Sequence, residues 1–376
     1  AARYLAENPH PPTANTAVAL TTMLADAQPA AQAAAITALC ASQGAAAISK
    51  VTPFLDTPEM ALRQAAVVGL IKHGGLDGML HAAATLKEML DSPTAVSRQT
   101  GANVLGELQI QTFYQPLLPL LTDDDTAVRL SAIRAAGQVG HPDLLPHLLA
   151  ALRDEAVAHT AVSAIVALGP GCEPLLADLL TNSDTPAQAR LHVPKILRQL
   201  QTPEAAAVLL RHLRDEDDHV RATVAKALAR LQSAGVAFDI DRDDVLAAVF
   251  GEVAHYYRLV VVHADLGGDG GGRLLDKTLR EHMAYTLDRL FYLLRLIYAE
   301  EAMVLVRQAL AAENGRFRAN AIELLDNVAD RDLRGVLLPL LEAPLPQLLA
   351  IAGANFDEHS QPMTTRLTDL TTNPDP

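Results

Sequence analysis

A pattern that returns about every 31 residues constrains this chain more than any other feature of its sequence. In its clearest copy, an acidic run at 123–125 precedes Val128 and Arg129, and apolar residues at helical spacing follow until Gly140. The position of Arg129 has counterparts at residues 32, 63, 98, 159, 190 and 221, so that neighbouring copies lie 30 to 35 residues apart. Internal similarity at such a regular spacing indicates a repeat protein.

Each repeat also contains an earlier apolar helix, for example at 115–121 and at 174–180. Two helices joined by a short turn rich in Asp and Pro form a hairpin, which cannot bury its apolar face alone. The hairpins must therefore stack, and the sequence predicts an all-α superhelix (a solenoid) with about seven hairpins in residues 1–236. This pattern resembles the HEAT-repeat family, whose units run helix, Asp-containing turn, and a second helix that begins with Val-Arg.

An acidic residue precedes the repeat arginine at a nearly constant distance. At six or seven residues, the Asp can cap the second helix and meet the Arg side chain of its own repeat. The stacked pairs are expected to form a structural ladder, and a row of arginines that binds an anionic ligand is the alternative. The pairs are Asp56 and Arg63, Asp91 and Arg98, Asp123 and Arg129, Asp184 and Arg190, and Asp215 and Arg221.

The regular spacing is lost after Leu231, and residues 237–345 are predicted to form variant helical repeats. Two helices of unusual length are expected there, at about 243–264 and 274–299, with a glycine-rich loop at 266–273 between them. A phosphate-binding loop would follow a strand, whereas an apolar helix precedes this one, so a solvated tether is the favoured interpretation. The Thr- and Pro-rich segment 346–376 is predicted to be a tail or linker.

Three segments, at 279–294, 318–328 and 337–342, resemble the HEAT-repeat region of bacterial nucleotide-transporter-like (ATP/ADP translocase-like) proteins. The resemblance implies a non-catalytic scaffold or regulatory module, the cytoplasmic region of a larger membrane protein. Since the membrane segments and nucleotide-binding domain of that family have no counterpart in these residues, neither transport nor nucleotide binding is expected of them. The chain begins with Ala1 and has no leader-like segment, so we expect it to be a piece of a longer protein.

Composition narrows the range of partners and compartments. Thirty Lys and Arg against 44 Asp and Glu give a net charge of −14, which repels nucleic acid and anionic lipid. No run of 18 or more apolar residues is free of charge, so no membrane insertion by these residues is expected. Cys40 and Cys172 lie in apolar helical patterns, which indicates buried, reduced thiols and a cytoplasmic location. The expected partner is another protein or a neighbouring domain of the same polypeptide.

The motifs of common enzymes are missing from the sequence. None of the 13 histidines is followed by Glu, which excludes paired His-Glu and His-Glu-x-x-His metal sites, and there is no Gly-x-Ser-x-Gly. The pairs His141/His147 and His255/His263 have spacings unsuited to one helical face, and the acidic runs lack the spacing of a calcium loop. We therefore expect no enzyme, cofactor or metal. The alternative to a region of a larger protein is a free-standing adaptor that binds a partner protein in its concave groove.

Overall fold

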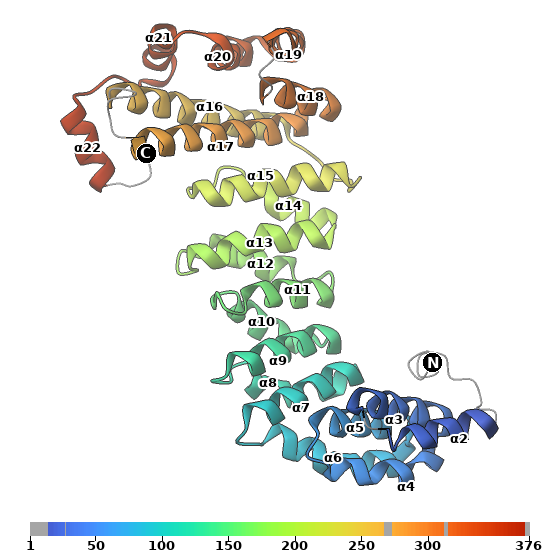
Figure 1. The fold of residues 1–376 in the computed structure, drawn as a ribbon. Coiled ribbons are helices and arrows are strands. Elements are labelled where there is room, and N and C mark those ends of the chain that lie inside the picture. Colours follow the sequence, from blue (N-terminus) through green and yellow to red (C-terminus); the bar gives the residue numbers. More distant parts are fainter. Residues whose placement is uncertain (1–13, 27, 267–272, 312–314, 373–376) are drawn as a thin grey trace. The chain divides into compact units, whose positions relative to one another are not determined.

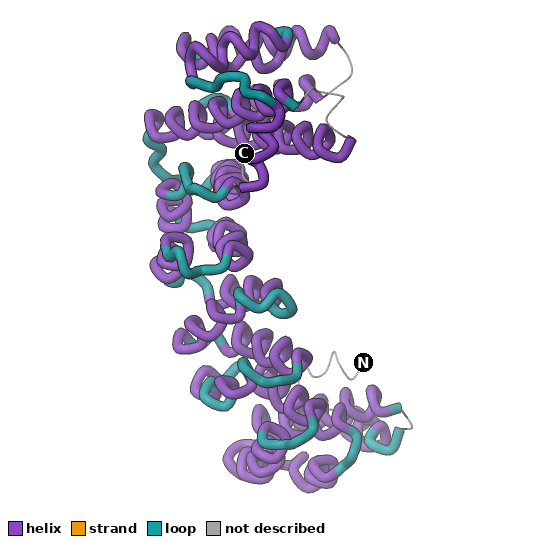
Figure 2. The backbone as a smooth tube through the Cα atoms, turned by 90° about the vertical axis from the view of Figure 1, so that its left-hand side faces the viewer, coloured by secondary structure: helices purple, strands orange, loops and turns teal. Residues whose placement is uncertain are grey.

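The structure is a computed structural model of the 376-residue chain, and it describes residues 14–26, 28–266, 273–311 and 315–372. In these residues every regular element is a helix, and short turns join most of them (Figure 2). The prediction of an all-α repeat fold is confirmed. Most of the expected glycine-rich loop, residues 267–272, lies outside the described residues.

The chain divides into two compact units, residues 1–172 and residues 173–376. The boundary predicted after residue 236 does not coincide with this division; it marks the point after which the helices become longer. The two longest helices, α16 (Arg242–Asp265) and α17 (Arg273–Ile297), follow that position inside the second unit.

In unit 1 the second helices of the repeats, α3, α5, α7, α9 and α11, pack on one another in this order (Figure 1). The first helix of a repeat is short or partly 3-10 in several of them, and the prolines at 53, 142 and 146 each stand at the start of a helical segment, where proline is tolerated. The elements are α2 (Ala14–Met23), α3 (Pro29–Gln43), η1 (Gly44–Ala47), α4 (Ile48–Val51), η2 (Thr52–Asp56), α5 (Met60–His73), α6 (Gly75–Leu90), α7 (Ala95–Leu108), η3 (Gln111–Phe113), α8 (Leu117–Leu120), α9 (Thr126–Val139), η4 (Pro142–Leu144), α10 (Leu145–Ala151) and α11 (Ala158–Leu168).

Small residues set the distance between the stacked helices of unit 1. A Cβ atom added to Gly137 on α9 would lie only 2.8 Å from the Cα of Ala164 on α11. A Cβ atom on Gly69 of α5 would lie 2.8 Å from the Sγ of Cys40 on α3. Glycine at these positions therefore permits a closer helix packing than any other residue would.

Within unit 2 the helices α13, α15 and α17 stack in this order, and α16 lies beside α17 along much of its length (Figure 1). The helices shorten again after α17, which allows α18 and α19 to pair and α20 and α21 to cover α16. The elements are α12 (Glu173–Thr181), α13 (Ala187–Leu200), α14 (Pro203–Arg211), α15 (Asp218–Ser233), α16, α17, α18 (Glu300–Ala311), α19 (Gly315–Val328), α20 (Arg331–Glu342), α21 (Leu345–Phe356) and α22 (Met363–Thr372).

The core of unit 2 is organised around α16. Tyr257 is fully buried, its hydroxyl donates to the backbone oxygen of Val336 at 2.9 Å, and its ring stacks on Phe356. Two described segments are long and apolar enough by composition to cross a membrane, Pro29–Asp56 and Arg242–Asp265, and 56% of the apolar 18-residue window of the second one is buried inside the structure. Buried core helices have the same composition, so these properties are weak evidence for a membrane span.

The segment predicted as a tail or linker is largely helical in the structure. Helices α21 and α22 contain most of its described residues, and both pack against α16. The Asp265 side chain at the end of α16 is fully buried, and it accepts hydrogen bonds from the backbone nitrogen of Gln361 and from Arg366, each at 3.0 Å. The composition of this segment could not reveal these contacts, because the residues that bind it lie about 100 residues earlier in the chain. A linker was therefore predicted.

Candidate functional site

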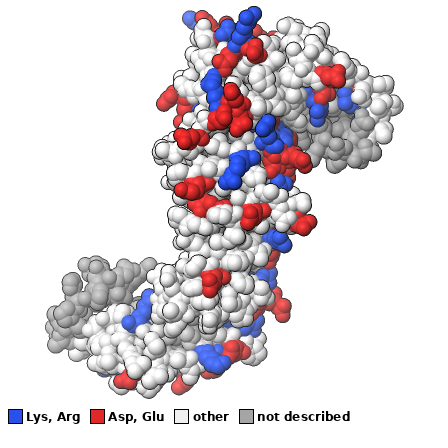
Figure 3. Space-filling model, turned by 180° about the vertical axis from the view of Figure 1, so that it is seen from behind, with Lys and Arg blue, Asp and Glu red and all other residues white. Residues whose placement is uncertain are grey.

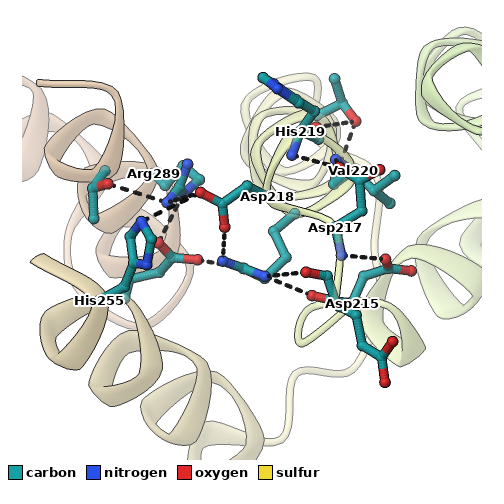
Figure 4. A network of polar contacts seen from close by, with 12 residues as sticks. Asp215, Asp217, Asp218, His219, Val220, His255 and Arg289 are labelled. Carbon is teal, nitrogen blue, oxygen red and sulfur yellow. Dashed lines mark hydrogen bonds and ion pairs between the residues drawn. The ribbon is translucent and has the colours of Figure 1, made fainter. Parts of the chain in front are cut away.

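The turns that precede α9 and α15, one in each unit, share one local structure. In unit 1, Asp125 caps α9 by accepting from the backbone nitrogens of Ala127 and Val128 at 2.8 and 3.3 Å. In unit 2, Asp217 accepts in the same way from His219 and Val220 at 2.8 and 3.2 Å (Figure 4). In α9 and α15 the cap is thus the acidic residue four before the repeat arginine, and not Asp123 or Asp215, which were expected in this role. Those two carboxylates instead accept from the backbone nitrogen two residues later. The helices α5, α7 and α13 have no side-chain cap.

The repeat arginines bind the acidic residue of the following repeat, and not the one of their own repeat. Arg98 makes a two-point ion pair with Asp123, at 2.6 and 2.8 Å, and Arg129 pairs with Asp154 at 3.0 Å. In unit 2, Arg190 contacts both carboxylate oxygens of Asp215, at 2.7 and 2.8 Å. Each partner lies 25 residues after its arginine. The expected pairs within one repeat are therefore corrected to pairs between consecutive repeats.

The arginine remains tied to its own turn through the backbone. Nη1 of Arg129 donates to the carbonyl oxygens of Asp123 and Asp124, at 2.8 and 3.1 Å. Nη1 of Arg221 makes the same contacts with Asp215 and Glu216. Because one edge of the guanidinium is occupied by its own turn, the other edge points to the next repeat.

Not all residues of the expected ladder take part in this arrangement. Arg63 pairs with Glu88 at 3.4 Å, and Asp91 pairs with Lys87 on α6. Within the part of the chain that the structure describes, Asp56 and Asp184 form no ion pair. We use the name inter-repeat ladder for the pairs that do form between repeats: Arg63–Glu88, Arg98–Asp123, Arg129–Asp154 and Arg190–Asp215.

Arg221 also binds its own turn and a carboxylate of a later helix, and this second contact belongs to a buried group of ion pairs where α15, α16 and α17 meet. Glu252 of α16 accepts from Nε of Arg221 at 2.8 Å and from Nε of Arg289 at 2.7 Å. Asp218 of α15 contacts both arginines, and its distance to Nη2 of Arg289 is 3.3 Å. Figure 4 shows Asp218 and His255 directed toward Arg289 from two different helices. We call Arg221, Glu252, Arg289, Asp218 and His255 the junction cluster.

Because the junction cluster is largely buried, its stability depends on an equal number of positive and negative charges. The side chains of Glu252 and Arg289 are only 4% and 6% exposed, and those of Arg221 and Asp218 are partly buried, so two guanidinium groups face two carboxylates away from most of the solvent. Burial opposes ionisation of Asp218, but the charges of the two arginines, and of His255 when it is protonated, outweigh it and lower the pKa of this carboxyl. Burial also lowers the pKa of His255, and it outweighs the charge of Asp218, which acts in the opposite direction. A neutral imidazole keeps the cluster balanced.

A hollow of about 720 Å³ opens directly on the junction cluster, between α15, α16 and α17. Its wall includes Lys226 and His219 of α15 and Tyr285 and Tyr292 of α17. The Tyr285 side chain is 62% exposed, unlike the buried aromatic rings of the core. A hollow of this size with a few polar groups and aromatic rings has the dimensions of a binding site.

A second hollow, of about 420 Å³, lies between α13 and α15 and shares Thr223 and Lys226 with the first. Basic side chains elsewhere on the surface often have an acidic neighbour, as on the face drawn in Figure 3. The residues that line the second hollow, in contrast, include four basic residues and no Asp or Glu.

The junction cluster was not predicted from the sequence, except for Arg221. A signal was present, since Glu252 and His255 interrupt the apolar run at 245–262. A charged residue inside a buried helix needs an oppositely charged partner. That partner could not be identified from the amino-acid pattern, because Arg289 lies 37 residues after Glu252 on another helix.

Several of the histidines considered as metal ligands have other contacts. His263 lies 2.7 Å from Asp276, and His141 stacks on Tyr114 with ring centroids 3.8 Å apart. Among the described residues, no group of three or more His, Cys, Asp or Glu side chains has the arrangement of a metal site.

Comparison with known proteins gives one family. Residues 83–169 and 173–249, together less than half of the chain, match the HEAT repeats family. A search of curated proteins gives no match. Two solved structures, each described as the crystal structure of an engineered protein, are 19% and 16% identical to this chain and cover 87% and 73% of it. The alignments cover 93% and 96% of those chains, with TM-scores of 0.32 and 0.19. With such TM-scores, they support no conclusion about this protein.

Proposed function

We propose that this protein is a helical-repeat scaffold that binds a partner protein at the hollow between α15, α16 and α17. HEAT repeats commonly mediate protein interaction, and the match to them includes α15 and the first part of α16. The observation that carries the proposal is the combination of this hollow with the exposed ring of Tyr285. Tyrosine and arginine are the residues most often responsible for affinity at protein interfaces.

The rigidity of the surrounding wall supports the same proposal. The junction cluster joins three helices through buried ion pairs, so the wall of the hollow is already formed before a partner arrives. A preformed site loses less conformational entropy on binding than a flexible one.

Photo-cross-linking tests this function. A benzoylphenylalanine at Tyr285 is expected to give a discrete protein adduct in the source cells, and the same residue at exposed Glu155 in unit 1 is not. Tyr285→Ala is then expected to weaken binding of that purified partner by about fivefold or more, in line with loss of an interface tyrosine. Adducts from neither position, or equal adducts from both, would contradict the proposal.

A second candidate is narrower: the scaffold is the cytoplasmic region of a larger nucleotide-transporter-like membrane protein. Its support is the sequence resemblance at 279–342, which corresponds to most of α17 together with α18, α19 and α20. The two cysteines, which are buried and form no disulfide in the described residues, are compatible with the cytoplasm.

The size of the native gene product distinguishes the two candidates. An antibody raised against this chain is expected to detect a membrane-associated protein far larger than 40.0 kDa if the narrower candidate holds. A soluble protein of about 40.0 kDa would instead support the free-standing adaptor.

A further inference from the structure

The second hollow concentrates positive charge in a chain that is acidic overall. Its four basic residues are Lys195 and Arg198 of α13 and Lys226 and Arg230 of α15. None of them forms an ion pair with a described residue, whereas all arginines of the inter-repeat ladder do. Glu300 accepts hydrogen bonds from Ser233 and Arg295. The charge of Arg230 makes only a small contribution to the lowered pKa of Glu300.

The repeat places these four charges together. Lys195 lies five residues after Arg190, and Lys226 lies five residues after Arg221, so the two lysines occupy equivalent positions on stacked helices. Arg198 and Arg230 lie about one helical turn further on the same faces. All four side chains are exposed. Their mutual repulsion is relieved when an anion binds between them.

The net charge of the chain favours a short anion over a long one. The four basic residues form a local group, and the neighbouring hollow carries acidic Glu216 and Asp288 beside basic Lys226 and Arg258. A long polyanion such as nucleic acid would extend past the four basic residues onto the rest of a chain whose net charge is −14, and it would be repelled there. A short acidic segment stays on the four basic residues, and a following apolar residue can contact Tyr285.

We propose that the four basic residues bind a short acidic segment of the partner protein, through its Asp and Glu carboxylates. This inference rests on the proposed function, and it specifies the chemistry of the partner. The segment lies across α13 and α15 and enters the shared part of the two hollows at Thr223 and Lys226.

Fluorescence anisotropy with the complete chain tests the assignment. The probe is a fluorescein-labelled peptide of about ten residues in which Glu alternates with Ser, long enough to span about 33 Å when extended. We expect it to bind, with affinity at least fivefold weaker when NaCl is raised from about 50 to about 300 mM. The same peptide with Gln in place of Glu is expected not to bind.

Matched variants locate the binding site. The variant K195Q/R198Q/K226Q/R230Q is expected to lower the affinity for the Glu peptide at least tenfold. The control K72Q/R134Q/R153Q/R214Q removes the same charge from exposed positions outside the hollow, and it is expected to change the affinity less than twofold. Circular dichroism of both variants verifies that they fold. An equal loss in both variants, or no binding by the unmodified chain, would overturn the proposal.

A third probe separates the possible anions. A single-stranded oligothymidine of the same charge is expected to bind more weakly than the Glu peptide, and tighter binding would overturn the assignment to protein. If cross-linking from Tyr285 identifies a partner whose contact segment has no carboxylates, this inference fails while the proposed function stands. If no partner is cross-linked, the proposed function fails independently of the peptide result.

Discussion

Glu252 is the side chain on which the junction cluster of unit 2 most depends. It is the only carboxylate within the cluster that is almost completely buried, and it contacts both arginines. Since the arginines cannot lose their protons, removing the charge of Glu252 leaves two guanidinium groups with Asp218 as the one remaining carboxylate of the cluster.

We expect Glu252→Gln to destabilise unit 2 by about 3–5 kcal/mol, the usual cost of breaking a buried ion pair on one side. Glu216→Gln at the exposed rim is the control, and it is expected to change stability by less than about 0.5 kcal/mol. Urea unfolding followed by circular dichroism measures both. A loss for Glu252→Gln as small as that of the control would show that water, and not Glu252, compensates the arginines.

His255 gives the junction cluster a dependence on pH. Burial lowers its pKa below the ordinary value of 6.5, so between these two pKa values the unfolded chain binds a proton that the folded chain does not. The contribution of His255 to stability is therefore fully present above about pH 6.5 and is lost as the pH is lowered toward the pKa of the folded state. The pKa values of His73 and His212 are lowered by burial as well, and they add to the same trend.

The substitution His255→Gln isolates this contribution. Below pH 6.5 we expect the variant to lose stability less steeply than the unmodified chain, by up to about 1.4 kcal/mol per pH unit for one proton. Urea unfolding at several pH values between about 5 and 7.5 gives both slopes. Identical slopes would mean that His73, His212 or other groups account for the whole dependence.

Helix packing in unit 1 depends on glycine at the contact between α9 and α11. Gly137→Ala is expected to destabilise the unit by about 1–3 kcal/mol, because the new Cβ would approach the backbone of Ala164 and the helices must separate. This cost exceeds the gain of about 1 kcal/mol that alanine brings to a helix. Native-state hydrogen exchange in α9 and α11 measures the change.

The control for this substitution is Gly251→Ala in α16. Gly251 is exposed, and a Cβ atom added to it would have no neighbouring atom within 4 Å, so alanine is expected to stabilise the helix by up to about 1 kcal/mol. Destabilisation by Gly251→Ala, or its absence in Gly137→Ala, would contradict the proposed origin of the close packing.

For the chain as a whole, the division into two units predicts that destabilisation stays local. In a repeat protein each repeat contacts mainly its neighbours, so stability is close to a sum over repeats and their interfaces. We expect Gly137→Ala to increase hydrogen exchange in residues 1–172 and Glu252→Gln to increase it in residues 173–376. If either variant increases exchange equally in both units, the chain unfolds as one cooperative structure.

The repeat period, the helix type and the place of the second helix in most repeats were predictable from the amino-acid pattern. The reason is that they depend on neighbours in sequence. Apolar residues at helical spacing form the buried face, and prolines and aspartates mark the turns. Accordingly, the repeat positions 63, 98, 129, 190 and 221 each lie three residues after the start of a helix.

The partners of charged side chains were not predictable in the same way. Within one repeat, Asp123 and Arg129 are close enough to pair, yet the turn occupies one edge of the guanidinium and directs the other edge to Asp154. The junction cluster joins residues from three helices, and α21 and α22 become ordered through contacts with α16 about 100 residues earlier. Local sequence encodes helices and turns, whereas ion pairs and hollows arise from residues that approach each other only when the helices pack.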